Sequence, residues 1–365
     1  MSLALEEARA AANRGETPVG AVIVDPGTND VVARDGNRVR EQASALAHAE
    51  MLVLAHAARA LGRERLTGLD LYVTLEPCAH HGKTPPCSEA LIEAGVTRVV
   101  AAMEDSDPRV SGRGFAQLRD AGIEVVTGLC AQDAARDNMG FFLRTEVGRP
   151  LLTLKLAMSL DGRIATRTGD SQWITGSAAR RAVHGLRASH DAVLIGAGTA
   201  RADDPSLTVR DLGVTRQPIR IVAAQSLSIP LESTLARSAQ KVPVWLCHGA
   251  AASDERKQAW EAVGAKLIAC GASEGGLDPE AMLKALGSLG LTRVFCEGGG
   301  HLAASLLRAD LVDRLIIHSA GVVMGGDGLS GVAPMGLDIL ADAARMRLLS
   351  HRQLGDDVEH IWERA

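Results

Sequence analysis

The stretch Cys78-Ala-His-His-Gly-Lys-Thr-Pro-Pro-Cys87, together with His48-Ala-Glu50 upstream, decides the fold of the first part of the chain. His48, Cys78 and Cys87 supply one imidazole and two thiols, a set of nitrogen and sulfur ligands that suits Zn²⁺. Three protein ligands leave the fourth tetrahedral position to water, which is typical of a catalytic zinc site. The pattern therefore predicts a zinc-activated water.

Glu50 lies two residues after the histidine, too close in sequence to be a natural fourth ligand. It is well placed as the catalytic residue that carries protons to and from the water. An H-x-E motif followed by P-C and a second cysteine is typical of zinc-dependent base deaminases. A lone His48 would more simply be a polar residue at a helix start, but the ordered set favours deamination.

The ten residues from Cys78 to Cys87 indicate which kind of substrate the site binds. We expect it to hold His80 and Lys83 beside the metal, with the lysine contacting a phosphate of a nucleotide-like substrate. Pro85-Pro86 would stiffen the return of the loop. The alternative is a solvated basic loop with no ligand.

Size and composition indicate a globular protein with room for two domains. The chain has 365 residues, of which 46% are hydrophobic and 23% charged. It has no run of about 18 apolar residues, so no membrane partner is expected. The N-terminus resembles an amphipathic helix rather than a signal peptide, and six cysteines do not make a disulfide scaffold. We expect a cytoplasmic protein.

The charge balance argues against a nucleic-acid partner. The net charge is −5, and residues 1–147 carry 15 Lys and Arg against 21 Asp and Glu. A protein that grips a phosphate backbone normally presents a basic face. A small-molecule substrate is therefore the better expectation.

Apolar β-rich runs alternate with helical patterns in the first 147 residues. Strands are expected at 20–24, 69–75 and 98–103, and helices at 48–61, 87–94 and 113–121. This alternation predicts an α/β sandwich with helices on both faces of a sheet. His48 and Cys87 would each open a helix, where the positive end of the helix dipole favours thiolate over thiol.

A domain boundary is expected near residue 147. The pattern breaks around Asn138-Met-Gly-Phe-Phe142, and Gly148-Arg-Pro150 then leads into a new strand. The predicted domains are therefore 1–147 and 148–365. In the second, strands are expected near 151–157, 191–196, 219–223, 242–247, 293–296 and 313–318, and helices near 176–188, 254–263, 279–289 and 300–308.

The second half has glycine-rich turns that suit a phosphate. Cys296-Glu-Gly-Gly-Gly300 runs from a strand into a helix, where backbone N–H groups can approach an anion closely. Gly196-Ala-Gly198 is followed by Thr199-Ala-Arg201, so the G-x-G-x-x-G motif is missing and Rossmann-type binding is not predicted. A plain tight turn is the alternative for these glycines.

With these motifs, the chain resembles the bifunctional deaminase/reductase family of riboflavin biosynthesis. The resemblance rests on Thr74-Leu-Glu-Pro-Cys78 and His80-His-Gly-Lys-Thr-Pro-Pro-Cys87. It continues through Asp107-Pro-Arg-Val-Ser-Gly-Arg-Gly114 and covers roughly residue 70 to the C-terminus. It implies a cytidine-deaminase-like α/β/α sandwich with zinc, followed by a dihydrofolate-reductase-like α/β domain that uses NADPH.

The resemblance also implies roles for residues of the second domain. The ribosylaminopyrimidine phosphate would be held by Lys155, Ser171, Arg187, Leu207, Arg210 and Glu297. The NADPH site would be lined by Ala157, Trp173, Thr199, Asp203, Gly299, Gly300, His301, Leu302, Ala303, Ala304 and Ser305. Asp203 is also the expected catalytic proton partner. Core packing for Trp173 and surface charge for the two arginines are the alternatives.

Two segments depart from the family pattern. Where the family often has Asp-Ser after the strand at Ile219, this chain has Ala224-Gln225, so a cofactor contact is lost or replaced there. The family usually opens with Asn-Pro-x-Val-Gly, but this chain has Glu16-Thr-Pro-Val-Gly20. Its Gly36-Asn-Arg38 looks more like the tRNA adenosine deaminase branch, in which the asparagine matching Asn37 touches the base.

The resulting hypothesis is an enzyme with two active sites acting in sequence: zinc-dependent deamination of a phosphorylated diaminopyrimidine, then NADPH-dependent reduction of its ribose. One alternative is the same reductase fused to a zinc deaminase with a base, nucleoside or tRNA adenosine as substrate. Another is a non-catalytic zinc module, against which Glu50 speaks because a structural site needs no proton shuttle. Because such sandwich domains often associate, a homo-oligomer is a further expectation.

Overall fold

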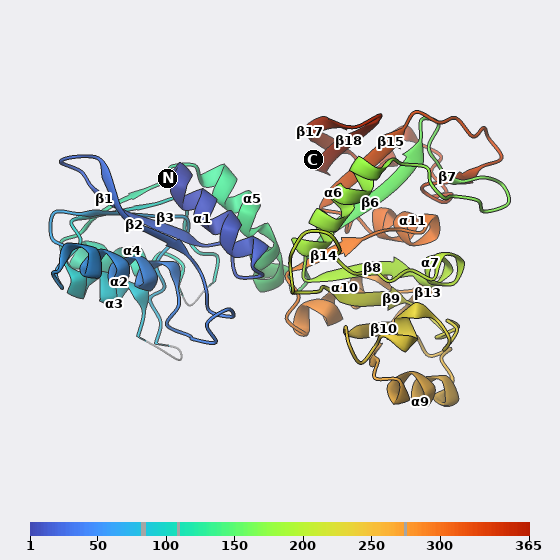
Figure 1. The fold of residues 1–365 in the computed structure, drawn as a ribbon, viewed down its shortest axis with the longest axis horizontal. Helices are drawn as coiled ribbons and strands as arrows, with labels where there is room; N and C mark the ends of the chain where they lie inside the picture. The colour runs from blue at the N-terminus through green and yellow to red at the C-terminus, as the bar shows by residue number, and fades with distance from the viewer. Residues whose placement is uncertain (82–84, 108–109, 274–275) are drawn as a thin grey trace. The chain divides into compact units, whose positions relative to one another are not determined.

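The structure, a computed structural model, describes residues 1–81, 85–107, 110–273 and 276–365. The chain forms two compact units, Met1–Val147 and Gly148–Ala365 (Figure 1). Across the described ranges, no helix has the length and apolar character needed to span a bilayer.

The first unit is built on a five-stranded sheet of order β2-β1-β3-β4-β5. Its strands are β1 (Gly20–Asp25), β2 (Asp30–Gly36), β3 (Asp70–Val73), β4 (Arg98–Ala101) and β5 (Glu124–Thr127). β1 runs antiparallel to both of its neighbours, whereas β3, β4 and β5 are parallel. The parallel strands β3 and β4 are mostly apolar and buried, because helices cover both faces of the sheet there, whereas the edge strand β5 is mostly exposed.

Helices lie on both faces of this sheet (Figure 1). On one face are α1 (Ser2–Asn13) and α5 (Ala131–Phe142); on the other are α2 (Ala49–Leu61), α3 (Cys87–Ala94) and α4 (Arg113–Asp120). α1 packs directly on the sheet, because a Cβ at Gly20 would lie 2.1 Å from the Ala4 carbonyl oxygen. The predicted α/β/α sandwich is confirmed.

The interruption of the sequence pattern around Asn138 does not correspond to a break in the helix. Helix α5 continues through this residue to Phe142, and a π-helical turn (Leu143–Val147) follows it. The Asn138 side chain is fully buried, and its amide donates to the carbonyl oxygens of Pro18 and Ala134, both at 3.1 Å. A buried amide that finds partners leaves the helix intact, although in sequence it interrupts the apolar face.

The second unit is built on a nine-stranded sheet of order β11-β10-β9-β8-β14-β6-β15-β18-β17. Its strands are β6 (Leu151–Ser159), β8 (Ala192–Gly196), β9 (Ile219–Ala223), β10 (Val244–His248), β11 (Lys266–Ala269), β14 (Arg293–Cys296), β15 (Arg314–Ala320), β17 (Met346–Leu354) and β18 (Asp357–Arg364). All neighbours from β11 to β15 are parallel, and β18 and β17 add an antiparallel edge.

Six helices and two small ribbons complete the described part of this unit. The helices are α6 (Ser177–Ala188), α7 (Ala197–Asp203), α8 (Thr234–Arg237), α9 (Asp254–Ala262), α10 (Pro279–Ser288) and α11 (Gly300–Arg308). The ribbons pair β7 (Arg163–Ala165) with β16 (Leu329–Ser330) and β12 (Ala272–Ser273) with β13 (Gly276–Leu277), and a 3₁₀ turn spans Leu340–Asp342.

The sheet has a core on each face because successive side chains of a strand point to opposite sides. In β8, Leu194 packs with α10 and α11 in one core, and Val193 and Ile195 pack with α6 and α9 in the other. The predicted strands and helices of this unit are present, with bounds within two residues of those expected.

A buried carboxylate joins both ends of the second unit. Asp313 accepts two hydrogen bonds from the Arg149 guanidinium, at 2.7 and 2.9 Å, and one from the Leu152 amide at 2.8 Å. Arg364, one residue before the C-terminus, donates to the same carboxylate at 2.7 Å. Arg149 and Asp313 are each only 4% exposed, so the charges are paired away from water.

Candidate active sites

The three expected zinc ligands converge in the first unit. His48 is the N-cap of α2, Cys78 follows β3 in a loop, and Cys87 is the first residue of α3. The Nδ1 atom of His48 lies 3.9 Å from the Cys78 sulfur and 3.4 Å from the Cys87 sulfur. In a tetrahedral zinc site, ligand N and S atoms are roughly 3.6 Å apart. The donor set and its spacing therefore fit Zn²⁺.

Within the described ranges, this is the one group of three or more His, Cys, Asp or Glu residues close enough to hold a metal, with ligand atoms within 4.8 Å of one another. The hydrogen bond from Cys87 lowers the pKa of Cys78 to about 4, and the hydrogen bond to Cys78, together with burial, raises the pKa of Cys87. Because zinc binds cysteine as thiolate, metal binding would release the proton that the raised pKa of Cys87 retains.

Glu50 lies in the first turn of α2 and is only 4% exposed. Burial raises the pKa of its carboxyl to about 7, although the neighbouring His48 opposes this shift. A carboxyl that titrates near neutrality can both accept and donate a proton at working pH. The structure therefore gives Glu50 the electrostatic setting of an acid–base group.

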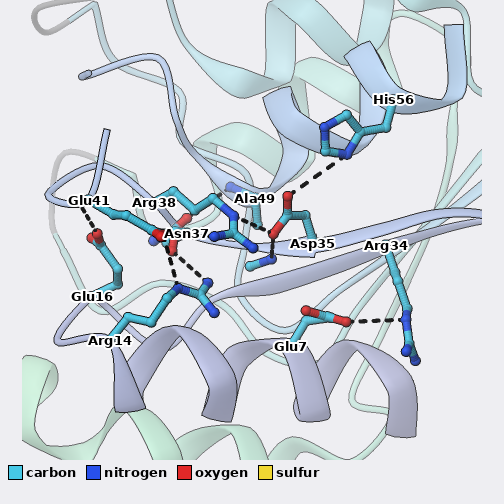
Figure 2. A network of polar contacts seen from close by, with 11 residues as sticks. Glu7, Arg14, Glu16, Arg34, Asp35, Asn37, Arg38, Glu41, Ala49 and His56 are labelled. Carbon is cyan, nitrogen blue, oxygen red and sulfur yellow. Dashed lines mark hydrogen bonds and ion pairs between the residues drawn. The ribbon is translucent and has the colours of Figure 1, made fainter. Parts of the chain in front are cut away.

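Asn37 is held against the start of α2 (Figure 2). Its side-chain oxygen accepts a hydrogen bond of 2.9 Å from the Ala49 amide, directly after the histidine ligand, and Arg14 donates to its carbonyl oxygen at 3.2 Å. Because the oxygen is used in this way, the Asn37 NH₂ group is the part of the side chain that remains for a ligand.

Glu16, which begins the segment that departs from the family's Asn-Pro-x-Val-Gly motif, has a structural role. This residue is 4% exposed, and one carboxylate oxygen accepts hydrogen bonds of 2.8 Å from the amides of Arg40 and Glu41 (Figure 2). Arg14 contacts the side chain of Glu41 at 3.2 Å. The loop that follows Asn37 is thereby tied to the end of α1, next to the metal ligands.

The loop between the cysteines is described only in part. Lys83 lies outside the described residues. His80 is half-buried, and its Nδ1 atom is buried without a hydrogen-bond partner in the described part of the chain. An orphaned nitrogen next to the ligand loop is available to a substrate.

Sequence reasoning missed Glu76, which lies two residues before Cys78. Its carboxylate is 2% exposed and accepts hydrogen bonds from the amides of Asp105, Gly112, Gly114 and Phe115, at 2.9 to 3.2 Å. At Gly114 a Cβ would lie 2.1 Å from the Pro77 carbonyl oxygen, so the two segments touch through backbone. Glu76 therefore fixes the position from which Cys78 reaches the metal site.

The second unit contains a cavity of about 610 Å³, here called the reductase cavity. This volume is typical of small-molecule and cofactor sites. Of the residues expected at the cofactor or substrate, it is lined by Ser171, Thr199, Asp203, Gly299, Gly300, His301, Leu302 and Ser305. It is not lined by Ala157, Trp173, Ala303 or Ala304. Ala303 and Ala304 are buried in the core under α11, and Trp173 is 70% exposed, with Arg180 stacked on its ring.

Two glycines shape this cavity. Gly299 has a positive φ of 73°, and a Cβ there would lie 2.9 Å from the Thr199 hydroxyl. A Cβ at Gly300 would lie 2.8 Å from the Ser330 carbonyl oxygen. The loop before α11 is thus a cradle that a side chain would fill, which fits a cofactor approaching the backbone closely.

The charged residues expected at the substrate phosphate lie on three elements. Lys155 in β6 is buried, which lowers the pKa of its ammonium group, and Glu297 after β14 opposes this shift. Glu297 also pairs with Arg187 of α6 at 2.5 Å. A further Arg187 nitrogen donates to the Thr208 carbonyl at 2.9 Å. The alternative interpretation, that Arg187 is only a charged residue on the surface, is therefore wrong.

The loop after α7 supplies the remaining two residues. Leu207 is buried with a positive φ of 55°, an unusual conformation for a branched side chain. The side chain of Arg210 is exposed, and its amide donates to Nδ1 of His184 at 3.2 Å. Burial and the nearby arginines lower the pKa of His184. This histidine was not predicted, because a lone His on a helix carries no signal in sequence.

Fold and sites define an enzyme that joins a zinc-deaminase domain to a reductase domain. Residues 1–103 match the cytidine and deoxycytidylate deaminase zinc-binding region, and residues 150–359 match the RibD C-terminal domain. The chain belongs to the RibD family of riboflavin biosynthesis proteins. It is 40% identical over 348 residues to riboflavin biosynthesis protein RibD of Escherichia coli strain K12, covering 92% of each chain.

Other relatives match the whole length of the chain. RibD of Aquifex aeolicus is 34% identical over 364 residues, 100% of this chain and 97% of that protein. The structure of Acinetobacter baumannii RibD, form 1, is similar with a TM-score of 0.85 at 32% identity, covering 100% of this chain and 97% of that one. A Thermotoga maritima diaminohydroxyphosphoribosylaminopyrimidine deaminase/5-amino-6-(5-phosphoribosylamino)uracil reductase gives 0.83 at 28% identity, with the same coverage. The expected family and fold class are confirmed.

Proposed function

We propose that this enzyme deaminates 2,5-diamino-6-(5-phosphoribosylamino)pyrimidin-4-one in its first unit and then reduces the ribose of the product to a ribityl chain in its second unit. The observation that carries the proposal is the coexistence of a His48-Cys78-Cys87 triad beside buried Glu50 with a separate 610 Å³ cavity. The neighbour from Thermotoga maritima is named for the same pair of activities, a deaminase and a reductase.

The residues of the first unit suit hydrolytic deamination. Bound zinc would supply the Lewis acidity that makes a water nucleophilic near neutral pH. Glu50 takes one proton of that water and delivers it to the ring nitrogen; it then takes the second proton from the hydroxyl added to the ring and gives it to the departing amine. Its pKa of about 7 suits both halves of this exchange. The Asn37 amide and the orphaned His80 nitrogen orient the pyrimidine, and Lys83 contacts the substrate phosphate.

The residues of the second unit suit reduction at the sugar. NADPH would supply the hydride for the ring-opened ribosylamine. Arg187 and Arg210 present planar guanidinium groups to the substrate phosphate. The other residues of this substrate site are Lys155, Ser171, Leu207 and Glu297. Asp203 lies at the end of α7 and lines the reductase cavity, where it provides the proton that balances hydride addition. Gly299 and the first residues of α11, up to Ser305, complete the cofactor site in this proposal, with Trp173 as a further contact from outside the cavity lining.

The test is to give the zinc-loaded protein the diaminopyrimidine substrate without NADPH and to measure ammonia. Release of ammonia, followed by NADPH oxidation when the cofactor is added, is the expected result. If ammonia does not form while pre-deaminated substrate is still reduced, the first half of the proposal is wrong. Ammonia from adenosine in a tRNA anticodon stem-loop, and none from the pyrimidine, would favour the altered-substrate alternative.

A further inference from the structure

The segment that carries two of the expected substrate contacts has no regular structure of its own. It spans residues 204–210, the first part of the connection from α7 to β9, and is here called the substrate loop. It contains Leu207 and Arg210. A loop outside any helix or sheet keeps one conformation only if other groups bind its amides and carbonyls. The side chains that do so therefore decide where Arg210 points.

Gln217 holds the substrate loop at both backbone groups of one residue. The Val209 amide donates to the side-chain oxygen of Gln217 at 2.7 Å, and the NH₂ group of Gln217 donates to the Val209 carbonyl oxygen at 3.1 Å. A neighbouring antiparallel strand would offer the same pair of hydrogen bonds. Pro218 follows and disfavours the helical conformation for Gln217, which favours an extended backbone just before β9.

Two further side chains tie the first half of the substrate loop. Arg220 of β9 is fully buried, and its guanidinium donates to the Ser206 carbonyl oxygen at 3.3 Å. The carboxylate of Asp204 accepts hydrogen bonds from the amide and the hydroxyl of Thr234, at 2.7 and 2.8 Å. The first half of the loop is thereby anchored to β9 and α8, and Gln217 anchors the second half.

The residues on either side of Val209 contact α6, where the substrate phosphate is expected. The Thr208 carbonyl oxygen accepts a hydrogen bond of 2.9 Å from Arg187, and the Arg210 amide donates to Nδ1 of His184 at 3.2 Å. The side chain of Arg210 is exposed, and no carboxylate of the described residues pairs with it. The direction of this guanidinium is therefore set by the backbone that carries it.

We propose that Gln217 is a positioning residue of the reduction step: by binding both backbone groups of Val209, it fixes the direction in which Arg210 presents its guanidinium to the substrate phosphate. Gln217 contacts neither substrate nor cofactor in this assignment and acts only through the substrate loop. The assignment rests on the proposed reductase function and adds a residue that determines how its substrate is held.

The experiment measures steady-state reduction of pre-deaminated substrate by the full-length enzyme at saturating NADPH. Gln217→Glu keeps the shape and the acceptor for the Val209 amide, but it has no donor and places a negative charge against the Val209 carbonyl oxygen. Gln217→Ala removes both hydrogen bonds. Each change should raise the KM about tenfold and leave kcat within about twofold of the wild type. The matched control is Gln258→Glu, the same change of charge at an exposed position of α9.

A second substrate distinguishes positioning from a general loss of structure. The same compound without its phosphate makes no use of Arg210, so its KM should change less than about twofold in both Gln217 variants. Ammonia release by the first unit, and NADPH affinity measured by calorimetry, should also stay unchanged. Thermal unfolding of each variant confirms that the fold is kept.

The outcomes separate this assignment from the proposed function. A wild type that does not reduce the phosphorylated substrate would show that the reductase proposal is wrong, and this assignment with it. An active wild type, together with Gln217 variants whose KM equals that of Gln258→Glu, would overturn the assignment alone. An equal rise in KM for both substrates, or a lower kcat at unchanged KM, would also overturn it, because Gln217 would then not act on phosphate binding.

Discussion

Glu297 accepts two hydrogen bonds from the guanidinium of Arg187, at 2.5 and 2.8 Å, and thereby joins the end of β14 to α6. The pair lies close enough to buried Lys155 for both of its charges to act on the pKa of that lysine. One carboxylate thus offsets two cations, and a net positive charge is left for an anionic substrate.

Arg187→Lys tests this arrangement, because an ammonium group cannot reproduce the two parallel N–H bonds to Glu297. We expect the KM for the phosphorylated pyrimidine in the reduction step to rise about tenfold. Ammonia release by the first unit should stay unchanged, and it serves as the internal control in the same sample. Unchanged reduction kinetics would show that Arg187 does not bind the substrate.

The zinc triad and Glu50 should separate metal binding from chemistry. Glu50→Gln keeps the side-chain volume but cannot carry a proton, so zinc should remain bound while ammonia release falls by about a hundredfold or more. Cys87→Ser should lose both zinc and ammonia release. Both variants should still reduce pre-deaminated substrate. Metal content and ammonia are measured together, and full ammonia release by Glu50→Gln would contradict its role as proton carrier.

Glu76→Gln should weaken zinc binding, although Glu76 is not a ligand, because this residue holds the segment that carries Cys78. The glutamine has one acceptor oxygen, and its NH₂ group would face backbone amides that now donate to the carboxylate. We expect a loss of about 2 kcal/mol in the free energy of unfolding and faster zinc loss to a chelator. The exposed Glu93→Gln on α3 is the control. Equal zinc retention in both variants would show that Glu76 does not position Cys78.

His190 predicts a pH dependence of stability in the second unit. Its Nδ1 lies 2.7 Å from the Leu186 carbonyl oxygen and its Nε2 3.0 Å from the Thr153 hydroxyl, a pattern that the neutral ring satisfies. Burial lowers the pKa to about 4 from the ordinary 6.5. The unfolded chain therefore takes up a proton below pH 6.5 that the folded protein refuses until about pH 4.

Stability from this residue is thus complete above pH 6.5 and is lost as the pH falls toward 4. Between pH 7.5 and pH 5 the expected loss is about 2 kcal/mol. In urea unfolding, His190→Gln should show a smaller fall over this interval than the wild type by that amount. Parallel pH profiles for the two proteins would show that the ring is protonated in the folded state.

The sequence was sufficient for features that depend on local pattern. The zinc ligands were predicted because their spacing is fixed by short segments, and the parallel strands because both faces are buried and read as apolar runs. β17 was not predicted because most of its residues are exposed and it shows no apolar alternation. The helix through Asn138 could not be predicted from local pattern, because the hydrogen-bond partners of this buried amide include Pro18, far away in sequence.

The site features that could not be predicted from the sequence are those formed by segments far apart in the chain. The partners of Glu76 come from the loop and helix at residues 105–115, and nothing in its own neighbourhood indicates burial. The substrate roles of Asn37 and His80 remain predictions for the assays above.

The contacts of Asp313 have a consequence for how the second unit could be built. Because Arg149 and Arg364 bind the same carboxylate, the first and last residues of the unit meet at one point. In topological terms the unit is nearly a closed ring, and the place where its chain starts is not essential to its packing. A circular permutant that joins these ends, and opens instead at the exposed turn between β17 and β18, should keep the same sheet.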